Sequence, residues 1–510
     1  MMRKIKIFFI AIAAVAMLPS CLDKEPQSAI LEQEGMQTFN DAEQMLTGIY
    51  AMLKGSALYS GYLTLAPDIQ ADLVYAVEGN TNTYGSIWQW DIRPTTSEIE
   101  AVYASLYQVI SNCNFFLERV DGVMERLSSD DELEALRQYK GEVYTIRALM
   151  YSELLKCYCK AYDPGTAREE LGVVLRKGYS TPEPAVRASL YDSYAFVIED
   201  LERAEALLDE DNDTYTSPFI TKAVAHALHA RVALNMQDWD AAIEYSSKVI
   251  NHPNRAYTLS SANTIYSGTM TYFDYMWQYD LATEILWSVG FTTTSYGGAL
   301  GQVFLNYNVD YTYTYPDYVP AQWVLDLYEA GDNRYNAFFA TYTTGYDHSL
   351  SWPLLVKYYG NRDFISSSLI YHVSMPKPFR LAEQYLIRAE AYCRQQTPNF
   401  SQAAKDLSTL RAARFASGGS VSLSADNFLQ TISDERVREL YMEGFRLNDL
   451  KRWGAMYNDG GGFKRTPQSH SLPEGSSLEV KADNPLFVWP IPQHEIEAPG
   501  SQVQPNESNR

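Results

Sequence analysis

The sequence predicts a mostly α-helical protein, in which a tetratricopeptide-like helical repeat scaffold carries a large loop-rich and aromatic-rich insertion. Two observations carry this prediction. Alanine-rich amphipathic segments recur along the chain, and a stretch from about 257 to 374 loses the helical period and becomes rich in tyrosine, glycine and threonine. A chain of roughly 490 residues after its leader exceeds one compact core, so we expect an extended array or two subdomains.

Residues 1–20 are predicted to be a secretory signal peptide. A basic start leads into an apolar run that ends at Met17, which is too short for a permanent membrane span. The run closes on Leu18-Pro19-Ser20-Cys21, which resembles a bacterial lipobox, with Pro19 in place of the usual small residue. We expect cleavage before Cys21, lipidation of this cysteine and a lipidated N-terminal linker over 21–38. The alternative is a plain signal peptide followed by an incidental cysteine.

Residues 39–256 are predicted to form the N-terminal part of the repeat scaffold. Small and long apolar residues alternate at helical spacing over 144–155 and 226–236, and again over 385–394 near the other end of the chain. The last two stretches continue through a polar turn, an aromatic (Trp239 or Phe400) and a second alanine-bearing helix, which is the tetratricopeptide-type hairpin. One hairpin cannot bury its own apolar face, so further helices over 39–53, 101–120 and 190–208 are expected to stack with it.

Residues 257–374 are predicted to be an insertion of loops and short strands between repeat helices. Two tyrosine-rich runs, 272–280 and 306–318, lie within it. A similar aromatic segment, 82–91, interrupts the N-terminal helices. Loops held on a rigid scaffold are frequent locations of binding sites.

Residues 375–455 are predicted to hold the C-terminal repeat hairpin and a charged helix pair, and 456–510 a proline-containing strap. The charged segment 432–453 is helical in pattern, with Gly444 at its bend. Its interleaved arginines and glutamates predict structural ion pairs and no catalytic site. Pro490 and Pro492 lack backbone donors, which forces an extended path over the helices.

Composition excludes one class of partner and gives little support for metals or redox chemistry. The formal net charge of −22, about −25 without the basic leader, would repel a phosphate backbone, so we expect no nucleic acid. The remaining cysteines, all in helix-like stretches, are predicted to be small buried residues, with a bridged pair as the alternative. They are Cys113, Cys157, Cys159 and Cys393.

No metal, cofactor or catalytic motif is recognisable. His226 and His229 lack the spacing and glutamate of zinc proteases, and the acidic run 209–213 lacks the glycine and glutamate of a calcium loop. No nucleotide-binding loop or nucleophile elbow occurs. We therefore expect no catalytic residue, no metal ligand and no cofactor.

Taken together, the motifs resemble the SusD/RagB family of outer-membrane nutrient-binding lipoproteins of Bacteroidetes. The resemblance rests on the lipobox at Cys21, the pattern Glu435-Arg436-x-x-Glu439-Leu with its continuation to Trp453, and Pro490-Ile491-Pro492-x-x-Glu495. The chain departs from the family at its end, where Gln502-Val-Gln-Pro-Asn506 replaces a Gln-Asn-Pro-Gly-Tyr-like tail.

The resemblance implies a non-catalytic protein that binds oligosaccharide or polysaccharide at the cell surface and delivers it to a SusC-like TonB-dependent outer-membrane transporter. It also implies a lipid anchor in the outer membrane, with the protein facing the cell exterior. Two alternatives stay open: the same role with a peptide cargo, as in the RagB branch, or a glycoside hydrolase with a hidden carboxylate pair.

Candidate glycan ligands follow from the chemistry of sugars, whose flat C–H faces pack on aromatic rings while their hydroxyls need carboxylate and amide partners. If residues 311–315 are extended, alternate tyrosines share one face and form a ladder. Trp88 and Trp90 would likewise share a face. The candidates are Tyr311, Tyr313, Tyr315, Trp88, Trp90 and the acceptors Asp68 and Asp72. The alternatives are that the rings pack on the helices and that the aspartates serve as caps or turn residues.

Overall fold

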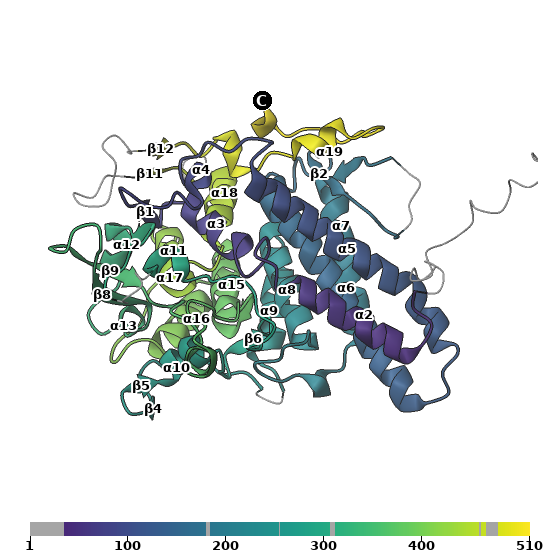
Figure 1. The fold of residues 1–510 in the computed structure, drawn as a ribbon, viewed down its shortest axis with the longest axis horizontal. Coiled ribbons are helices and arrows are strands. Elements are labelled where there is room, and N and C mark those ends of the chain that lie inside the picture. The colour runs from purple at the N-terminus through teal and green to yellow at the C-terminus, as the bar shows by residue number, and fades with distance from the viewer. Residues whose placement is uncertain (1–34, 180–183, 254–255, 307–311, 458–460, 466–477) are drawn as a thin grey trace, which may run out of the picture.

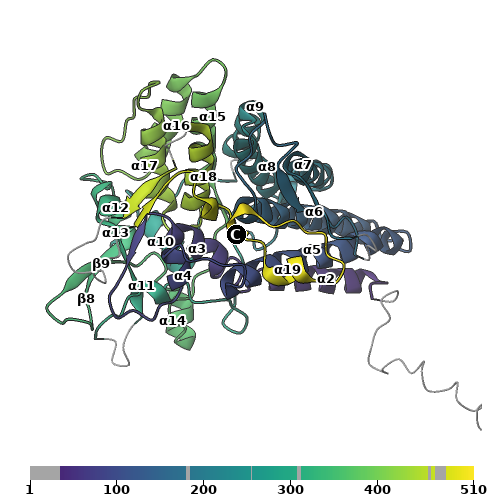
Figure 2. The same ribbon diagram turned by 90° about the horizontal axis from the view of Figure 1, so that it is seen from above.

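The computed structural model describes residues 35–179, 184–253, 256–306, 312–457, 461–465 and 478–510, and it is predominantly helical. Figures 1 and 2 show the long N-terminal helices extending to one side and the insertion with its hairpin lying on the other. The scaffold consists of α2 (Phe39–Met52), α5 (Ser97–Met124), α6 (Asp130–Tyr158), α7 (Leu190–Leu207), α8 (Lys222–Met236), α9 (Trp239–Ile250), α15 (Leu381–Arg394), α16 (Phe400–Ala412), α17 (Phe428–Leu440) and α18 (Arg446–Tyr457).

The helices form one continuous array in space although the insertion divides them in sequence. Each helix from α5 to α9 packs on the next, and α15 then packs on α9 and α16 on α15. Alanines from α8, α9 and α15 meet in one buried cluster that includes Ala230, Ala242 and Ala391. Small side chains at these positions let the helix axes approach closely, as the repeat pattern predicts. The fold is therefore the tetratricopeptide-like scaffold expected from the sequence.

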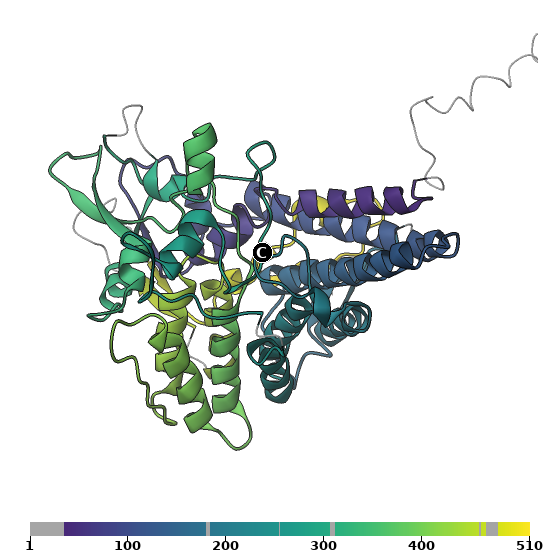
Figure 3. The same ribbon diagram turned by 90° about the horizontal axis from the view of Figure 1, so that it is seen from below.

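The insertion occupies the segment between the end of α9 and the start of α15. It contains β4 (Ile265–Ser267), β5 (Met270–Thr271), α10 (Tyr272–Tyr279), β6 (Ile285–Trp287), α11 (Gln302–Leu305), β7 (Tyr318–Pro320), α12 (Gln322–Asp326), α13 (Arg334–Phe338), β8 (Phe339–Thr343), β9 (Ser351–Leu355), α14 (Arg362–Ser368) and β10 (Phe379–Arg380). Figure 3 shows it lying away from α5 and α6.

Short antiparallel strand pairs connect the insertion to the scaffold. Strand β7 pairs with β1 (Val74–Ala76), which follows the N-terminal helix α3 (Tyr62–Gln70), and β6 pairs with β10 at the start of α15. Within the insertion, β8 and β9 form a regular hairpin in which Tyr342 lies opposite Trp352. The insertion is thus joined to the α3 region through β7, and its strand β6 pairs with β10 directly before α15.

The C-terminal strap crosses the ends of the N-terminal helices, as the yellow segment in Figures 1 and 2 shows. It includes β11 (Phe463–Arg465), β12 (Leu478–Val480), a 3-10 turn (Pro485–Phe487) and α19 (Gln493–Glu497). The backbone N–H of Trp489 donates to the Cys157 carbonyl at 2.8 Å, and its indole N–H donates to Gln70 Oε1 at 2.7 Å. The unusual tail is also seated, because the Asn506 amide donates to the carbonyl of Tyr158 and accepts from Arg187.

The predicted buried state of the cysteines is confirmed. Cys113, Cys157, Cys159 and Cys393 are buried and free. Over the described ranges, no helix combines the length and the hydropathy needed to cross a membrane.

A column of buried carboxylates along and just beyond α17 organises the insertion. Glu435 and Glu439 are fully buried and lie one turn apart on α17, whereas Glu443, with a side chain 7% exposed, follows three residues after the helix ends. Arg380 contacts both Glu439 and Glu443, which joins the three carboxylates into one column. The cations that meet them come from four other segments. The closest N···O distances are 2.7 Å for Arg334 to Glu435, 2.9 Å for both Arg380 and Arg414 to Glu439, and 2.6 Å for Lys357 to Glu443. The predicted structural role of this charge pattern is confirmed.

The protonation states of this network follow from burial and from its charges. Burial alone would raise the pKa of Glu439, but the guanidinium groups of Arg414 and Arg380 outweigh burial and hold it well below its usual value. Burial lowers the pKa of Lys357 to about 8, against the opposing attraction of Glu443. At neutral pH the carboxylates are therefore ionised and paired.

The bend between α17 and α18 is held by two aspartates of the α3 region. Gly444 has φ +84°, and a Cβ there would lie 2.4 Å from the Leu63 carbonyl oxygen, so glycine is required by both conformation and space. Asp68 accepts hydrogen bonds from the backbone N–H groups of Gly444 and Arg446 at 3.0 and 2.8 Å. Asp72 pairs with the Arg446 guanidinium through two bonds of 2.8 Å. The predicted bend at Gly444 is confirmed.

We predict that Glu439→Gln lowers the free energy of unfolding by about 3 to 5 kcal/mol, because it removes a carboxylate that the buried Arg380 and Arg414 share and leaves their charge only partly balanced by Glu284 and Glu443. The control is Glu134→Gln, which removes a solvent-exposed i,i+3 pair with Arg137 and should cost less than about 1 kcal/mol. Urea unfolding of the lipid-free chain measures both. Equal effects of the two changes would contradict the structural role of the column.

A second prediction concerns pH. Burial raises the pKa of Asp68 to about 7 from an ordinary value of 3.8, although the N–H groups of Arg446 and Gly444 oppose the shift. The folded chain thus keeps a proton that the unfolded chain releases near pH 4, and this stabilisation is lost as pH rises through 7. We expect the difference in the free energy of unfolding between wild type and Asp68→Asn to narrow from pH 5 to pH 8, by up to about 1.4 kcal/mol per pH unit.

Thermal melts across this pH range measure this difference, with the exposed Asp91→Asn change as control. A difference that stays constant or widens with pH would contradict the assignment.

Candidate functional site

Trp88 and Trp90 are core residues, which corrects the expectation that they share an exposed face. Trp88 ends the short helix α4 (Gly85–Trp88), is 4% exposed, and donates its indole N–H to the Val74 carbonyl. Trp90 has φ +60°, is 7% exposed, and packs edge-on against Phe487 at 5.0 Å. The helical end followed by a left-handed residue separates the two rings into different core clusters. Neither ring has a face open to a sugar.

Asp68 and Asp72 are also structural, because both of their carboxylates serve the bend at Gly444. Asp68 is fully buried, and Asp72 is 9% exposed with both oxygens on Arg446. The expectation that they accept from sugar hydroxyls is therefore wrong. Both act through contacts with residues more than 370 positions away, so the alternative of a local cap or turn residue does not describe them either.

The predicted tyrosine ladder over 311–315 is described by the structure only at Tyr313 and Tyr315. Tyr311 lies outside the described residues, whereas Tyr313 and Tyr315 are half-buried on an extended segment, with Thr314 buried between them. This segment runs beside the turn of the β8–β9 hairpin: the Thr314 N–H donates to the Thr343 carbonyl, and the Gly345 N–H donates back to Thr314 at 2.8 Å. The predicted period-two alternation is thus present at 313–315.

Each of the two tyrosines meets an aromatic residue of the hairpin turn. Tyr313 stacks on His348 with ring centroids 3.9 Å apart and planes 6° from parallel. Tyr315 lies edge-on to Tyr346 at 5.3 Å. We call these four residues, Tyr313, Tyr315, Tyr346 and His348, the aromatic patch.

Gly345 allows the Tyr315 ring to lie directly on the backbone of the turn. A Cβ at this position would lie 2.0 Å from Tyr315 Cζ, so any larger residue would displace the ring. Burial raises the pKa of Tyr346 to about 12, so its hydroxyl stays protonated and donates to the Pro316 carbonyl at 3.2 Å. The Tyr315 ring is therefore fixed against the turn, and the neighbouring Tyr346 hydroxyl is uncharged at neutral pH.

The loop 77–83 supplies polar groups beside the patch. Asp317 accepts from the Thr81 backbone N–H at 2.9 Å and from its hydroxyl, and Tyr318 donates to the Thr83 carbonyl at 2.6 Å. These bonds hold the loop against the strand that follows the tyrosine segment. Thr81, Asn82 and Thr83 are exposed. The N-terminal aromatic segment thus contributes hydroxyl and amide groups here, while its tryptophans face the core.

Tyr346 and His348 carry little signal in the sequence that would select them as site residues. They lie in a run of turn residues without helical or strand period, and their proximity to Tyr313 and Tyr315 arises from the tertiary contact of two segments about 30 residues apart. The one local signal is the glycine between Thr344 and Tyr346, which suggests a turn.

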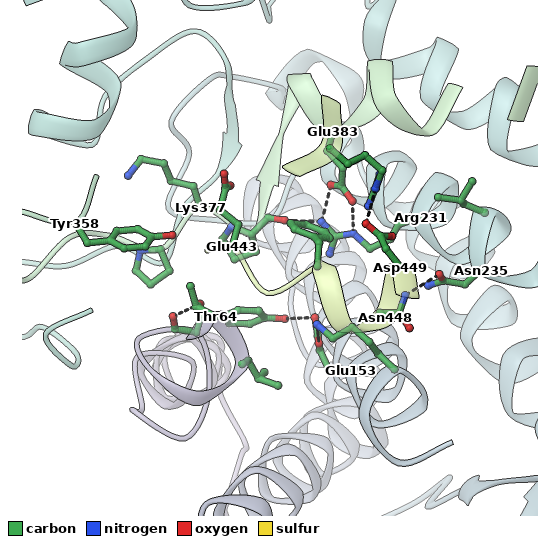
Figure 4. Close-up of a pocket in the computed structure, with 18 of the residues that line it drawn as sticks. Thr64, Glu153, Arg231, Asn235, Tyr358, Lys377, Glu383, Glu443, Asn448 and Asp449 are labelled. Atoms are coloured by element: carbon green, nitrogen blue, oxygen red, sulfur yellow. Dashed lines mark hydrogen bonds and ion pairs between the residues drawn. The ribbon is translucent and has the colours of Figure 1, made fainter. Parts of the chain in front are cut away.

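A small cavity lies in the interior, where the N-terminal helices meet α15 and α18 (Figure 4). It has a volume of about 50 Å³, which accommodates one or a few water molecules and no sugar ring. Arg231 on its wall forms bidentate bonds of 2.7 and 2.6 Å with Glu383, and Asn448 contacts Asn235 at 3.1 Å. This cavity belongs to the charged interior that joins the helices.

Residues with metal-binding potential are paired internally. His229 Nδ1 lies 2.9 Å from Glu205 and its ring stacks on Tyr245, while His252 contacts Asp213 at 2.9 Å. Within the part of the chain that is described, no group of three or more histidine, cysteine or acidic side chains could hold a metal ion.

Two family models match the chain. Residues 332–507 match the model described as SusD family, and residues 21–234 match the model described as starch-binding associating with outer membrane. These ranges contain the charged column of α17, the strap and the long N-terminal helices.

Individual proteins resemble the chain over most of its length. A SusD-like protein P25 of Formosa agariphila is 23% identical over 478 residues, covering 85% of this chain and 86% of the relative. A solved SusD superfamily protein from Bacteroides thetaiotaomicron superposes with a TM-score of 0.77 at 23% identity, covering 92% of this chain and 99% of that one.

A putative sugar binding protein from Bacteroides vulgatus superposes with a TM-score of 0.74 at 22% identity, covering 93% and 100% of the two chains. At these identities the solved structures establish the shared fold. The two family models, which match the N-terminal helices and the chain from α13 to the C-terminal strap, show that the chain belongs to the SusD/RagB family.

Proposed function

We propose that the protein binds oligosaccharide or polysaccharide at the cell surface without cleaving it and delivers it to a SusC-like TonB-dependent transporter. The observation that carries the proposal is the aromatic patch beside the exposed hydroxyl and amide groups of loop 77–83. Aromatic faces and uncharged hydrogen-bonding groups suit the alternating apolar and hydroxyl surfaces of a sugar chain. The Bacteroides vulgatus protein of the same fold, named a putative sugar binding protein, supports the same role.

The carboxylates nearest the patch support a binding role over hydrolysis. Glycoside hydrolases need two carboxyl groups on either side of the scissile bond. Asp317 is 2% exposed and engaged by Thr81, and Asp347 accepts from the backbone and side chain of Ser349. Both carboxylates thus have structural partners, and the rings remain as the contact surface.

The expected affinity is modest. Stacking of a base on an aromatic ring is worth about 1 to 3 kcal/mol, and a sugar ring should lie at or below this range. A few such contacts, reduced by the loss of motion on binding, correspond to dissociation constants on the order of micromolar to millimolar. Weak binding is compatible with a protein that must release its cargo to a transporter.

We predict that Tyr313→Ala and Tyr315→Ala each lower glycan affinity about tenfold, which corresponds to about 1.4 kcal/mol, because each removes one ring face from the patch. A polysaccharide array identifies the ligand, and calorimetry of each variant against it measures the effect. Tyr215→Ala is the matched control, because this tyrosine is 49% exposed and lies outside the patch. Trp90→Ala should lower the melting temperature strongly, as expected of a core ring.

The proposal fails if both patch variants bind like Tyr215→Ala, or if incubation releases shorter sugars from the bound glycan. Binding of peptides and of no glycan would favour the alternative cargo.

We further propose that Cys21, which lies outside the described residues, is lipidated and holds the protein on the outer face of the outer membrane. The lipobox motivates this, and one matching family model is described as associating with the outer membrane. Cys21→Ala should leave the protein soluble or misprocessed, because several acyl chains are needed for stable anchoring. Cell fractionation measures this.

Extraction of the wild-type protein in mild detergent should also co-purify a large barrel protein. Unchanged membrane retention of Cys21→Ala would contradict the anchor, and recovery of the wild type alone in several detergents would contradict a stable transporter complex.

A further inference from the structure

A separate open groove lies at the base of the β8–β9 hairpin, between α10, α13, β8 and α14, with a volume of about 650 Å³. None of the four residues of the aromatic patch lines it. The elements that form it are labelled in Figure 2. Its volume is within the range of about 300 to 1,000 Å³ that is typical of small-ligand sites.

The groove is lined by half-buried tyrosines from three different elements. Tyr279 comes from α10, Tyr342 from β8 and Tyr359 from the segment before α14. Tyr279 is held in place by a stack that runs outward along α10: its ring lies 4.9 Å from Tyr275, which lies 4.1 Å from the exposed Tyr266. The orientation of the Tyr279 ring is thus fixed by its neighbours, which lowers the entropy lost on ligand binding.

Polar groups converge on the same groove. Its lining includes Asp274, Gln278, Asn336, Arg362, Asp363 and Ser366. Arg362 and Asp363 are exposed, and neither forms an ion pair with any residue of the described ranges. The buried cations of the α17 column, in contrast, are all paired.

Two shielded atoms of the lining residues also lack partners within the described chain. Gln278 Oε1 and Trp277 Nε1 are inaccessible to water and have no hydrogen-bond partner there, and Trp277 is 3% exposed. Shielded polar groups of this kind cost free energy unless a partner reaches them. Both atoms lie behind the surface of the groove, so its contacts with a ligand come from the half-buried tyrosines and the exposed Arg362, Asp363 and Ser366.

We propose that this groove is a second oligosaccharide-binding site, specific for a neutral sugar chain. The proposal rests on the proposed function of the protein as a glycan binder. One guanidinium and two carboxylates give the groove a net negative charge, which disfavours uronic acids and sulfated sugars. The same planar groups can each contact two neighbouring hydroxyls of a neutral hexose.

The first variant fills the groove and leaves its tyrosines and charged side chains in place. Ser366→Trp places a large ring on its wall, and Ser367→Trp is the matched control, because Ser367 is the next exposed residue of α14 and does not line the groove. Arg362→Ala is a second groove variant that removes only an exposed side chain. The probes are neutral hexasaccharides of glucose, mannose, galactose and xylose.

Calorimetry of the lipid-free chain is performed in the wild type and in the Tyr313→Ala/Tyr315→Ala background. We expect residual binding in this background, and a further loss of about tenfold or more with Ser366→Trp or Arg362→Ala but not with Ser367→Trp. Residual binding that both groove variants leave unchanged, or no residual binding in the background, would overturn the second site alone. Absence of binding by the wild type to every probe would overturn the proposed function together with it.

Discussion

The buried carboxylate column of Glu435, Glu439 and Glu443 is the constraint on which the placement of the insertion depends. Side chains from four segments that are distant in sequence converge on this one side of α17 and its C-terminal extension. Burying an ion is expensive, so such a column is tolerated only when every member has partners. Arg414 meets this condition through Glu284 and Glu439, and Arg380 through Glu284, Glu439 and Glu443.

The column also determines where the aromatic patch lies. Arg334 begins α13, immediately before β8, and Lys357 follows the end of β9, so both ends of the hairpin are fixed on α17. The turn at the far end of this hairpin carries Tyr346 and His348. The groove at its base is bordered by α13 and α14, which lie next to the same two cations in sequence. Helices of the scaffold therefore position the aromatic patch, although none of its residues belongs to them.

Much of the scaffold could be predicted from the sequence, because helical period, alanine spacing and the bend at Gly444 are local signals. The strap was also predictable, since Pro490 and Pro492 restrict the backbone. The positions of the aromatic rings could not be predicted from the sequence. Trp88 and Trp90 are two residues apart, a spacing that indicates one face only in an extended segment, and the left-handed conformation of Trp90 has no signal in the sequence. Asp68 and Asp72 pair with residues more than 370 positions away. The alternation of Tyr313 and Tyr315 was predictable because it is a local pattern of a short extended segment, whereas their contacts with His348 and Tyr346 depend on tertiary structure.

The most direct test of this account is amide hydrogen exchange of the lipid-free chain, compared between wild type and Glu435→Gln. Exchange reports local opening element by element. If the column fixes the hairpin, the amides of β8, β9 and α13 should lose protection by at least about tenfold while those of α5, α6 and α7 keep theirs. Unchanged protection of the hairpin, or an equal loss along the whole chain, would contradict the claim that the column holds the hairpin and its aromatic patch in place.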